Sequence, residues 1–128
     1  MGYYLGKTIA ASFDEAVARV TAELKKEGFG VLTEIDVKKT LKAKLDVDFR
    51  PYKILGACNP PLAYRALQAE DKIGVMLPCN VIVQEVAEGQ VEVAAMAPVA
   101  AMAAVGNPEL QEIAEQVQAK LRAMVARL

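Results

Sequence analysis

The stretch YKILGACNPP, residues 52–61, decides the fold because it predicts a strand that passes directly into a helix. Pro51 permits a starting or edge strand, and residues 52–58 have the composition of one. Asn59 followed by Pro60 is the pattern of a helix N-cap with proline at the first helical position. We therefore predict a strand over 52–58 and a helix over 60–69.

The residues before this stretch predict a strand, a helix and a second strand. Residues 3–10 are rich in aromatic and β-branched side chains, which favours a strand. Ser12 and Glu15 form a capping box for a helix that Gly28 ends. Residues 29–35 then predict the second strand.

Further elements are predicted on both sides of residues 52–61. Asp36 can cap a short helix with an apolar stripe at Val37, Leu41 and Leu45. Residues 72–86 and 90–97 predict two strands joined by a tight turn. Asn107 with Pro108 opens a final helix. Its apolar seam comprises Leu110, Ala114, Val117, Leu121, Met124 and Leu128.

The order of these elements, β-α-β-α-β-α-β-β-α, predicts an α+β fold. Helices should cover one face of a mostly antiparallel or mixed sheet. The 128 residues fit one domain, and 54% hydrophobic with 24% charged residues is an ordinary globular composition. We predict that residues 1–128 form a single domain.

Charge and hydropathy argue against two classes of partner. Lysine and arginine total 15 against 16 acidic residues, so the chain has no overall field that gathers nucleic acid or an anionic membrane. The basic side chains between Lys38 and Lys53 are interpreted as a solvated surface. The most apolar run, residues 93–105, contains Pro98 and is shorter than the ~20 residues of a membrane-spanning helix. Residues 1–5 lack the pattern of a signal peptide, so we expect a cytoplasmic protein with reduced cysteines.

The chain has no histidine, which removes the usual general base, the Ser-His-Asp triad, the Cys-His pair and most zinc sites. Met96 and Met102 could join the two cysteines in binding a soft metal, but their spacing is nonspecific and core packing is preferred. We therefore predict no metal site and no catalytic residue, and the sequence identifies no cofactor.

The candidate site consists of two Cys-Asn steps, Cys58-Asn59 and Cys79-Asn80. Cys58 should lie near unpaired N–H groups at a helix start, a setting that stabilises a thiolate or holds an anionic ligand. Pro78 should interrupt the strand that contains Cys79. If the two strands pair, both steps could flank one pocket.

The same residues also have a purely structural interpretation. Cysteine packs as a small hydrophobe, and Asn59 serves as a helix cap, whereas Asn80 has no evident structural task. Three functions remain open. The first is a non-enzymatic domain that binds a small, anionic or thiol-reactive ligand at Cys58, Asn59, Cys79 and Asn80. The second is a thiol-based redox or transfer enzyme in which Cys58 attacks and Cys79 resolves, and the third is a structural homodimerising module.

Three motifs, at residues 52–60, 77–81 and 96–98, carry a resemblance to a known family. Together they resemble the bacterial and archaeal family catalogued as domain of unknown function 302, over nearly the whole chain. The resemblance implies a compact α+β fold, a homodimer and no established biochemical activity. Members have an acidic residue where this chain has Ala97, so chemistry that depends on that acid is not expected here.

Overall fold

Alternation of buried and exposed side chains along the strands decides which face of the sheet becomes the core. In the two strands of the late hairpin, Val81, Val83, Val91 and Val93 are completely buried, and the residues between them are not. Successive side chains of a strand point to opposite faces, so one face of the sheet is apolar and buried. The helices pack on this face.

The computed structural model describes residues 2–128, and its strands form one antiparallel sheet in the order β1-β5-β4-β3-β2. The strands are β1 (Tyr4–Ala10), β2 (Gly30–Asp36), β3 (Tyr52–Cys58), β4 (Cys79–Ala87) and β5 (Gln90–Met96). β3 therefore lies between β2 and β4, and it is not an edge strand.

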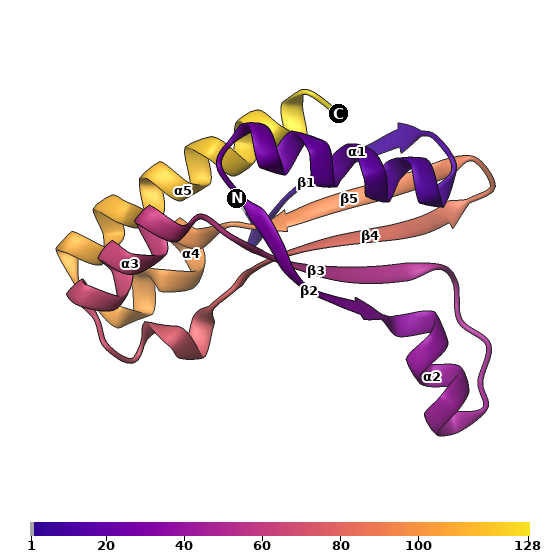
Figure 1. The fold of residues 1–128 in the computed structure, drawn as a ribbon, viewed down its shortest axis with the longest axis horizontal. Helices are drawn as coiled ribbons and strands as arrows, with labels where there is room; N and C mark the ends of the chain where they lie inside the picture. The colour runs from indigo at the N-terminus through magenta and orange to yellow at the C-terminus, as the bar shows by residue number, and fades with distance from the viewer. Residues whose placement is uncertain (1) are drawn as a thin grey trace.

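Helices α1 (Phe13–Lys26), α3 (Pro60–Ala69), α4 (Pro98–Met102) and α5 (Pro108–Ala126) lie on the same side of the sheet (Figure 1). α2 (Val37–Leu45) stands apart from them, at the end of β2. Two 3₁₀ turns, η1 (Ile73–Met76) and η2 (Ala103–Val105), complete the elements. The predicted α+β fold, with helices on one face, is confirmed.

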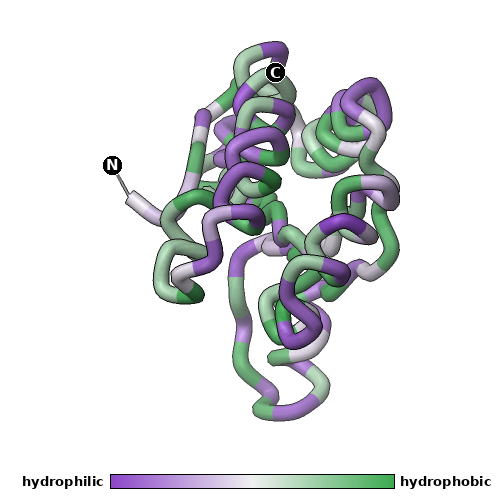
Figure 2. Tube along the Cα trace, turned by 90° about the vertical axis from the view of Figure 1, so that its left-hand side faces the viewer, coloured by the Kyte–Doolittle hydropathy of each residue, from purple (hydrophilic) through white to green (hydrophobic). Residues whose placement is uncertain are grey.

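The predicted helix starts are present in the structure. The Ser12 hydroxyl accepts from the Glu15 N–H at 3.2 Å, and the Glu15 carboxylate accepts from the Ser12 N–H at 3.1 Å, which is the capping box. The Asn107 side chain accepts from the backbone of Glu109 and Leu110 at the start of α5. Along α5, which ends at the C-terminus, hydrophobic and hydrophilic residues alternate around the axis (Figure 2). The seam residues from Leu110 to Met124 are buried, as predicted.

Two expectations about secondary structure are wrong, and two further features of the structure were not predicted. Residues 73–76 form η1 and not part of a strand, and Pro78 precedes β4 instead of interrupting it. Residues 98–105 form α4 and η2, because Pro98 starts a helical turn directly after β5. The predicted apolar stripe of α2 does not join the core, since no residue of α2 is buried and Leu45 is 65% exposed.

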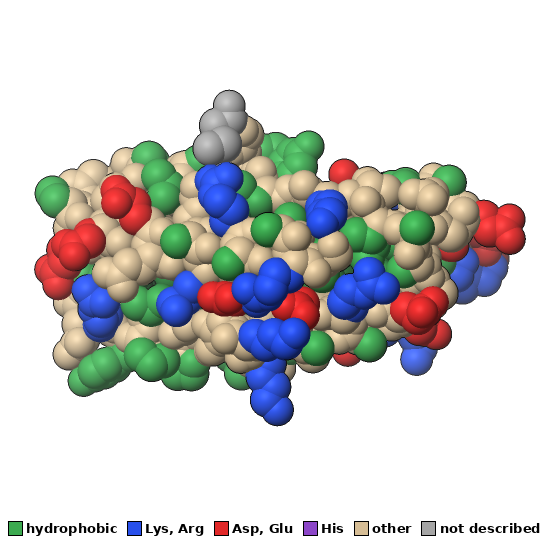
Figure 3. Space-filling model, turned by 90° about the horizontal axis from the view of Figure 1, so that it is seen from above, with side chains coloured by type: hydrophobic (Ala, Val, Ile, Leu, Met, Phe, Trp, Pro, Cys, Tyr) green, Lys and Arg blue, Asp and Glu red, His purple; other side chains and the backbone are tan. Residues whose placement is uncertain are grey.

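Several of the basic side chains between Lys38 and Lys53 have partners within the domain. Lys42 bridges to Asp46 at 2.9 Å, Lys53 bridges to Glu34 at 2.7 Å, and Lys38 donates to a backbone carbonyl. The face seen from above mixes cationic and anionic side chains, without a large area of one sign (Figure 3). None of the helices in residues 2–128 is both long and apolar enough to cross a membrane.

Candidate functional site

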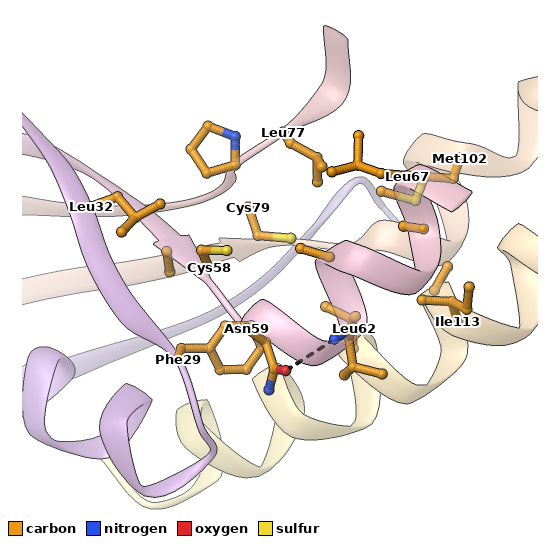
Figure 4. A pocket seen from close by; sticks show the side chains of 16 residues that line it. Phe29, Leu32, Cys58, Asn59, Leu62, Leu67, Leu77, Cys79, Met102 and Ile113 are labelled. Carbon is orange, nitrogen blue, oxygen red and sulfur yellow. Dashed lines mark hydrogen bonds between the residues drawn. The ribbon is translucent and has the colours of Figure 1, made fainter. Parts of the chain in front are cut away.

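A cavity of about 310 Å³ lies where the ends of β2, β3 and β4 meet α3, α4 and α5 (Figure 4). Its inner wall includes Ala57 and Ile113, both almost completely buried. Leu32 and Leu67 also line the cavity and are 69% and 43% exposed. Apolar side chains therefore form both its depth and its rim, an environment that favours an apolar group over a charged one.

The strand register brings the two cysteines together at this cavity. Ala57 of β3 pairs with Cys79 of β4, so Cys58 lies one residue beyond the partner of Cys79. From the rise along a strand and the separation of paired residues, the two cysteine Cα atoms are about 6 Å apart. Both thiols are free, both line the cavity, and both sulfur atoms point into it (Figure 4).

The two thiols differ in their environment. Cys79 is 6% exposed, whereas Cys58 is half-buried. Burial, and next the charge of an ionised Cys58, raise the pKa of the Cys79 thiol to about 11. Cys79 is therefore a neutral thiol at physiological pH.

Asn59 lies in the cavity wall, but its side chain is committed to the backbone. Its Oδ1 accepts from the N–H of Leu62 at 3.4 Å, shown as the dashed line in Figure 4, and its Nδ2 donates to the carbonyl of Glu27 at 3.2 Å. The bond to Leu62 caps α3. The bond to Glu27 joins the start of α3 to the turn that follows α1. Because both the oxygen and the nitrogen of the amide are bonded to the backbone, Asn59 has a structural role in the cavity wall and is not a main ligand contact.

The start of α3 does not provide the unpaired N–H groups that the sequence predicted near Cys58. The first two helical positions are Pro60 and Pro61, which carry no N–H. The next N–H, of Leu62, is bonded to Asn59, and that of Ala63 donates to the Asn59 carbonyl at 2.9 Å. This helix terminus therefore lacks the donors that bind anions elsewhere.

Asn80 lies away from the cavity, which corrects the expectation that both Cys-Asn steps flank one pocket. Cys79 faces the helices with Val81 and Val83, as predicted, so the next side chain must point to the other face of the sheet. There Asn80 is exposed, in a shallow hollow that Tyr52 also lines. An exposed asparagine leaves no buried polar group to satisfy, so its place in a strand needs no further explanation.

The cavity also contains residues that sequence reasoning missed. Leu62, Leu67 and Leu77 line it, and none had been singled out as part of a site, while Met102, which the sequence analysis assigned to core packing, lines it too. The proline signals predicted that a helix follows Asn59, and the spacing of Leu62 and Ala66 places them on one face of it, but the sequence does not show what that face contacts. Ala97, where the family resemblance implies an acid, is buried at the start of α4 and provides no side-chain cap.

Fold and site together define a class: a small α+β domain with an apolar cavity that contains two thiols. Within residues 2–128, no group of three or more His, Cys, Asp or Glu side chains is arranged to hold a metal ion.

The chain belongs to the DUF302 family, a domain of unknown function whose family model matches residues 5–128. It is also similar to a solved structure, the crystal structure of an uncharacterized conserved DUF302 protein from Bacillus stearothermophilus. The two are 30% identical, with a TM-score of 0.91 over 99% of this chain and 98% of the other. A comparison with curated proteins gives no match.

Proposed function

We propose that the domain binds a small, predominantly apolar molecule in the cavity between the sheet and α3. The observation that carries the proposal is the cavity itself, about 310 Å³ with apolar walls and the exposed Leu32 and Leu67 among its lining residues. Ligand sites in proteins are concave, largely preformed and mostly apolar, with volumes that begin near 300 Å³. Binding would also remove exposed leucine surface from water, which is favourable.

The polar groups of the cavity narrow the class of ligand. The amide of Asn59 is bonded to the backbone and the start of α3 has no free N–H, so an anionic group would lack donors. Cys58 is the half-buried polar group that a ligand can reach. These contacts favour a neutral molecule, and one with a thiol-reactive group would meet Cys58.

A thiol-based redox or transfer enzyme is the weaker candidate. A resolving cysteine attacks as its thiolate, and the raised pKa of Cys79, about 11, leaves few thiolates near neutral pH. The non-enzymatic binding domain requires no ionised thiol. It requires only reduced cysteines, which the cytoplasm maintains, so we propose that compartment.

The proposed binding is tested with N-phenyl-1-naphthylamine, a neutral apolar fluorophore. We expect its emission to rise as it enters the cavity of the wild-type domain. Ala63→Phe should raise the dissociation constant about tenfold or more, because the ring occupies the space beside α3. A tenfold increase corresponds to a loss of about 1.4 kcal/mol of binding free energy. The exposed Ala18→Phe in α1 is the matched control and should bind like wild type. Equal affinity of all three proteins would contradict the proposal.

We also propose that a second copy of the chain packs on the other face of the sheet. This face has an apolar centre that includes Ile82, Ala94 and Met96, with polar side chains such as Gln84 and Glu92 beside them, a pattern typical of interfaces. Light scattering should then give about twice 13.8 kDa for the wild type. Ile82→Lys should give the monomer mass and Leu45→Lys, on exposed α2, the dimer mass. A monomeric wild type would refute this interface.

A further inference from the structure

We infer that Met102 limits the length of the molecule that the cavity accepts, and that two glutamines of α5, Gln111 and Gln118, hold it in position. The inference rests on the proposed binding of an apolar molecule and names what selects that molecule. Met102 lines the cavity and is 5% exposed, and Figure 4 shows it at the opposite end of the lining side chains from the exposed Leu32. A ligand that enters beside Leu32 and extends inwards therefore ends against Met102.

Met102 belongs to α4, a helix that is too short to be stable without partners. Its five residues are far fewer than the ~12–15 at which an isolated helix becomes marginally stable in water. Its first position is Pro98, which has no N–H, and Ala97 before it provides no side-chain cap. The N–H of Val99, the first that α4 carries, therefore needs an acceptor from another element.

Two side chains of α5 provide the partners that α4 lacks. Oε1 of Gln118 accepts from the N–H of Val99 at 3.0 Å, and Nε2 of Gln111 donates to the carbonyl of Val99, also at 3.0 Å. The two glutamines are about two helical turns apart, so they bind Val99 from one face of α5. Because α5 also contributes Ile113 to the cavity, one helix positions both its own part of the wall and the part that α4 forms.

The side chain of Met102 suits a residue that limits ligand length. Methionine is unbranched and flexible and fills irregular gaps in apolar cores. Beyond Cβ, Met102 contributes Cγ, Sδ and Cε, so truncation to alanine should open room for about three carbon atoms, less what the neighbours recover by relaxing. Each methylene that a ligand buries raises its affinity about fourfold. The affinity of a straight-chain ligand should therefore stop rising at the length that meets Met102.

The test measures the affinities of straight-chain 1-alkanols, from 1-butanol to 1-dodecanol, by displacement of N-phenyl-1-naphthylamine. We expect the wild-type affinity to rise about fourfold with each methylene and then to level off at a limiting length. Met102→Ala should increase the limiting length by up to about three carbons. Met124→Ala is the matched control, because Met124 is completely buried but is not among the described residues that line the cavity. This control should lose stability and keep the wild-type limiting length.

The same substitution at the two glutamines tests how Met102 is held, and it does not depend on the folding of Met102→Ala. Gln118→Glu keeps an oxygen that accepts from the N–H of Val99, so the limiting length should not change. Gln111→Glu has no N–H to donate to the carbonyl of Val99, so α4 should be held less firmly. The alkanol one carbon longer than the wild-type limit should then bind about fourfold more tightly than it binds the wild type.

The outcomes separate this inference from the proposed function. The same limiting length in the wild type and a folded Met102→Ala variant, or the same limiting length in Gln111→Glu and Gln118→Glu, would overturn the inference and leave the cavity as a binding site. A wild-type domain that binds neither the fluorophore nor any alkanol would overturn both.

Discussion

Replacing Gly56 with alanine is expected to lower the free energy of unfolding by about 3 kcal/mol, the upper part of the range for an overpacked core. Gly56 is buried in β3, between Thr33 of β2 and Pro78 before β4. A Cβ at this position would lie 2.8 Å from Cγ of Pro78 and closer still to Oγ1 of Thr33. Pro78 also lines the cavity, so the added methyl group should disturb the cavity wall as well as the sheet.

Urea unfolding measures the effect, and two variants control it. At Gly30, also in a strand, an added Cβ meets no atom within 4 Å, so Gly30→Ala should change the stability by no more than about 1 kcal/mol. Thr33→Ala removes the nearest atom, so the double variant with Gly56→Ala should recover part of the loss. A Gly56→Ala variant as stable as Gly30→Ala would show that β2, β3 and Pro78 are not packed as described.

The stability that depends on Cys79 should disappear between pH 9 and pH 11. The pKa of this thiol rises from an ordinary 9.0 to about 11 on folding, first through burial and then through the charge of Cys58. Between these values the unfolded chain has lost the proton and the folded domain keeps it, so the free energy of unfolding falls as the pH rises. A shift of two pKa units corresponds to about 2.7 kcal/mol. Below pH 9 this contribution is fully present.

Cys79→Ala isolates the effect, because the other titrating groups remain in both proteins. Urea unfolding at several pH values from 8 to 11 should show the wild type losing about 2 kcal/mol more than Cys79→Ala over this range, most of the full effect. The alanine variant should start from a lower stability at pH 8, since it leaves a small cavity. Parallel pH profiles for the two proteins would contradict the burial of this thiol.

The sequence could predict most of the fold because its signals are local. Capping residues such as Ser12, Asn59 and Asn107 set helix starts through contacts within a few positions of themselves, and the structure has all three. The residues that were misjudged depend on distant partners. Residues 73–76 turn into η1 although their apolar character favours a strand, and the stripe of α2 is only half-buried at Val37 and Leu41 and is exposed at Leu45.

The candidate site was predictable only in part, for the same reason. The sequence could place the two cysteines beside each other only if β3 pairs with β4. In the structure the two strands do pair, with Ala57 opposite Cys79. Strand alternation then separates Asn80 from Cys79, a consequence that follows once β4 is known to begin at Cys79. The contribution of Ile113 from α5 could not be foreseen, because nothing local in the sequence shows which residues of α5 lie beside α3.

The measurement that tests the central claim most directly is a methyl NMR titration of the reduced domain with N-phenyl-1-naphthylamine. The account predicts that the methyl signals of Leu62, Leu67 and Ile113, which line the cavity, shift with a common saturation curve. The signal of Ile82, on the opposite face of the sheet, should stay in place. Shifts confined to Ile82 and its neighbours, or no saturable shift at Leu62, Leu67 and Ile113, would contradict the claim that this cavity binds an apolar molecule.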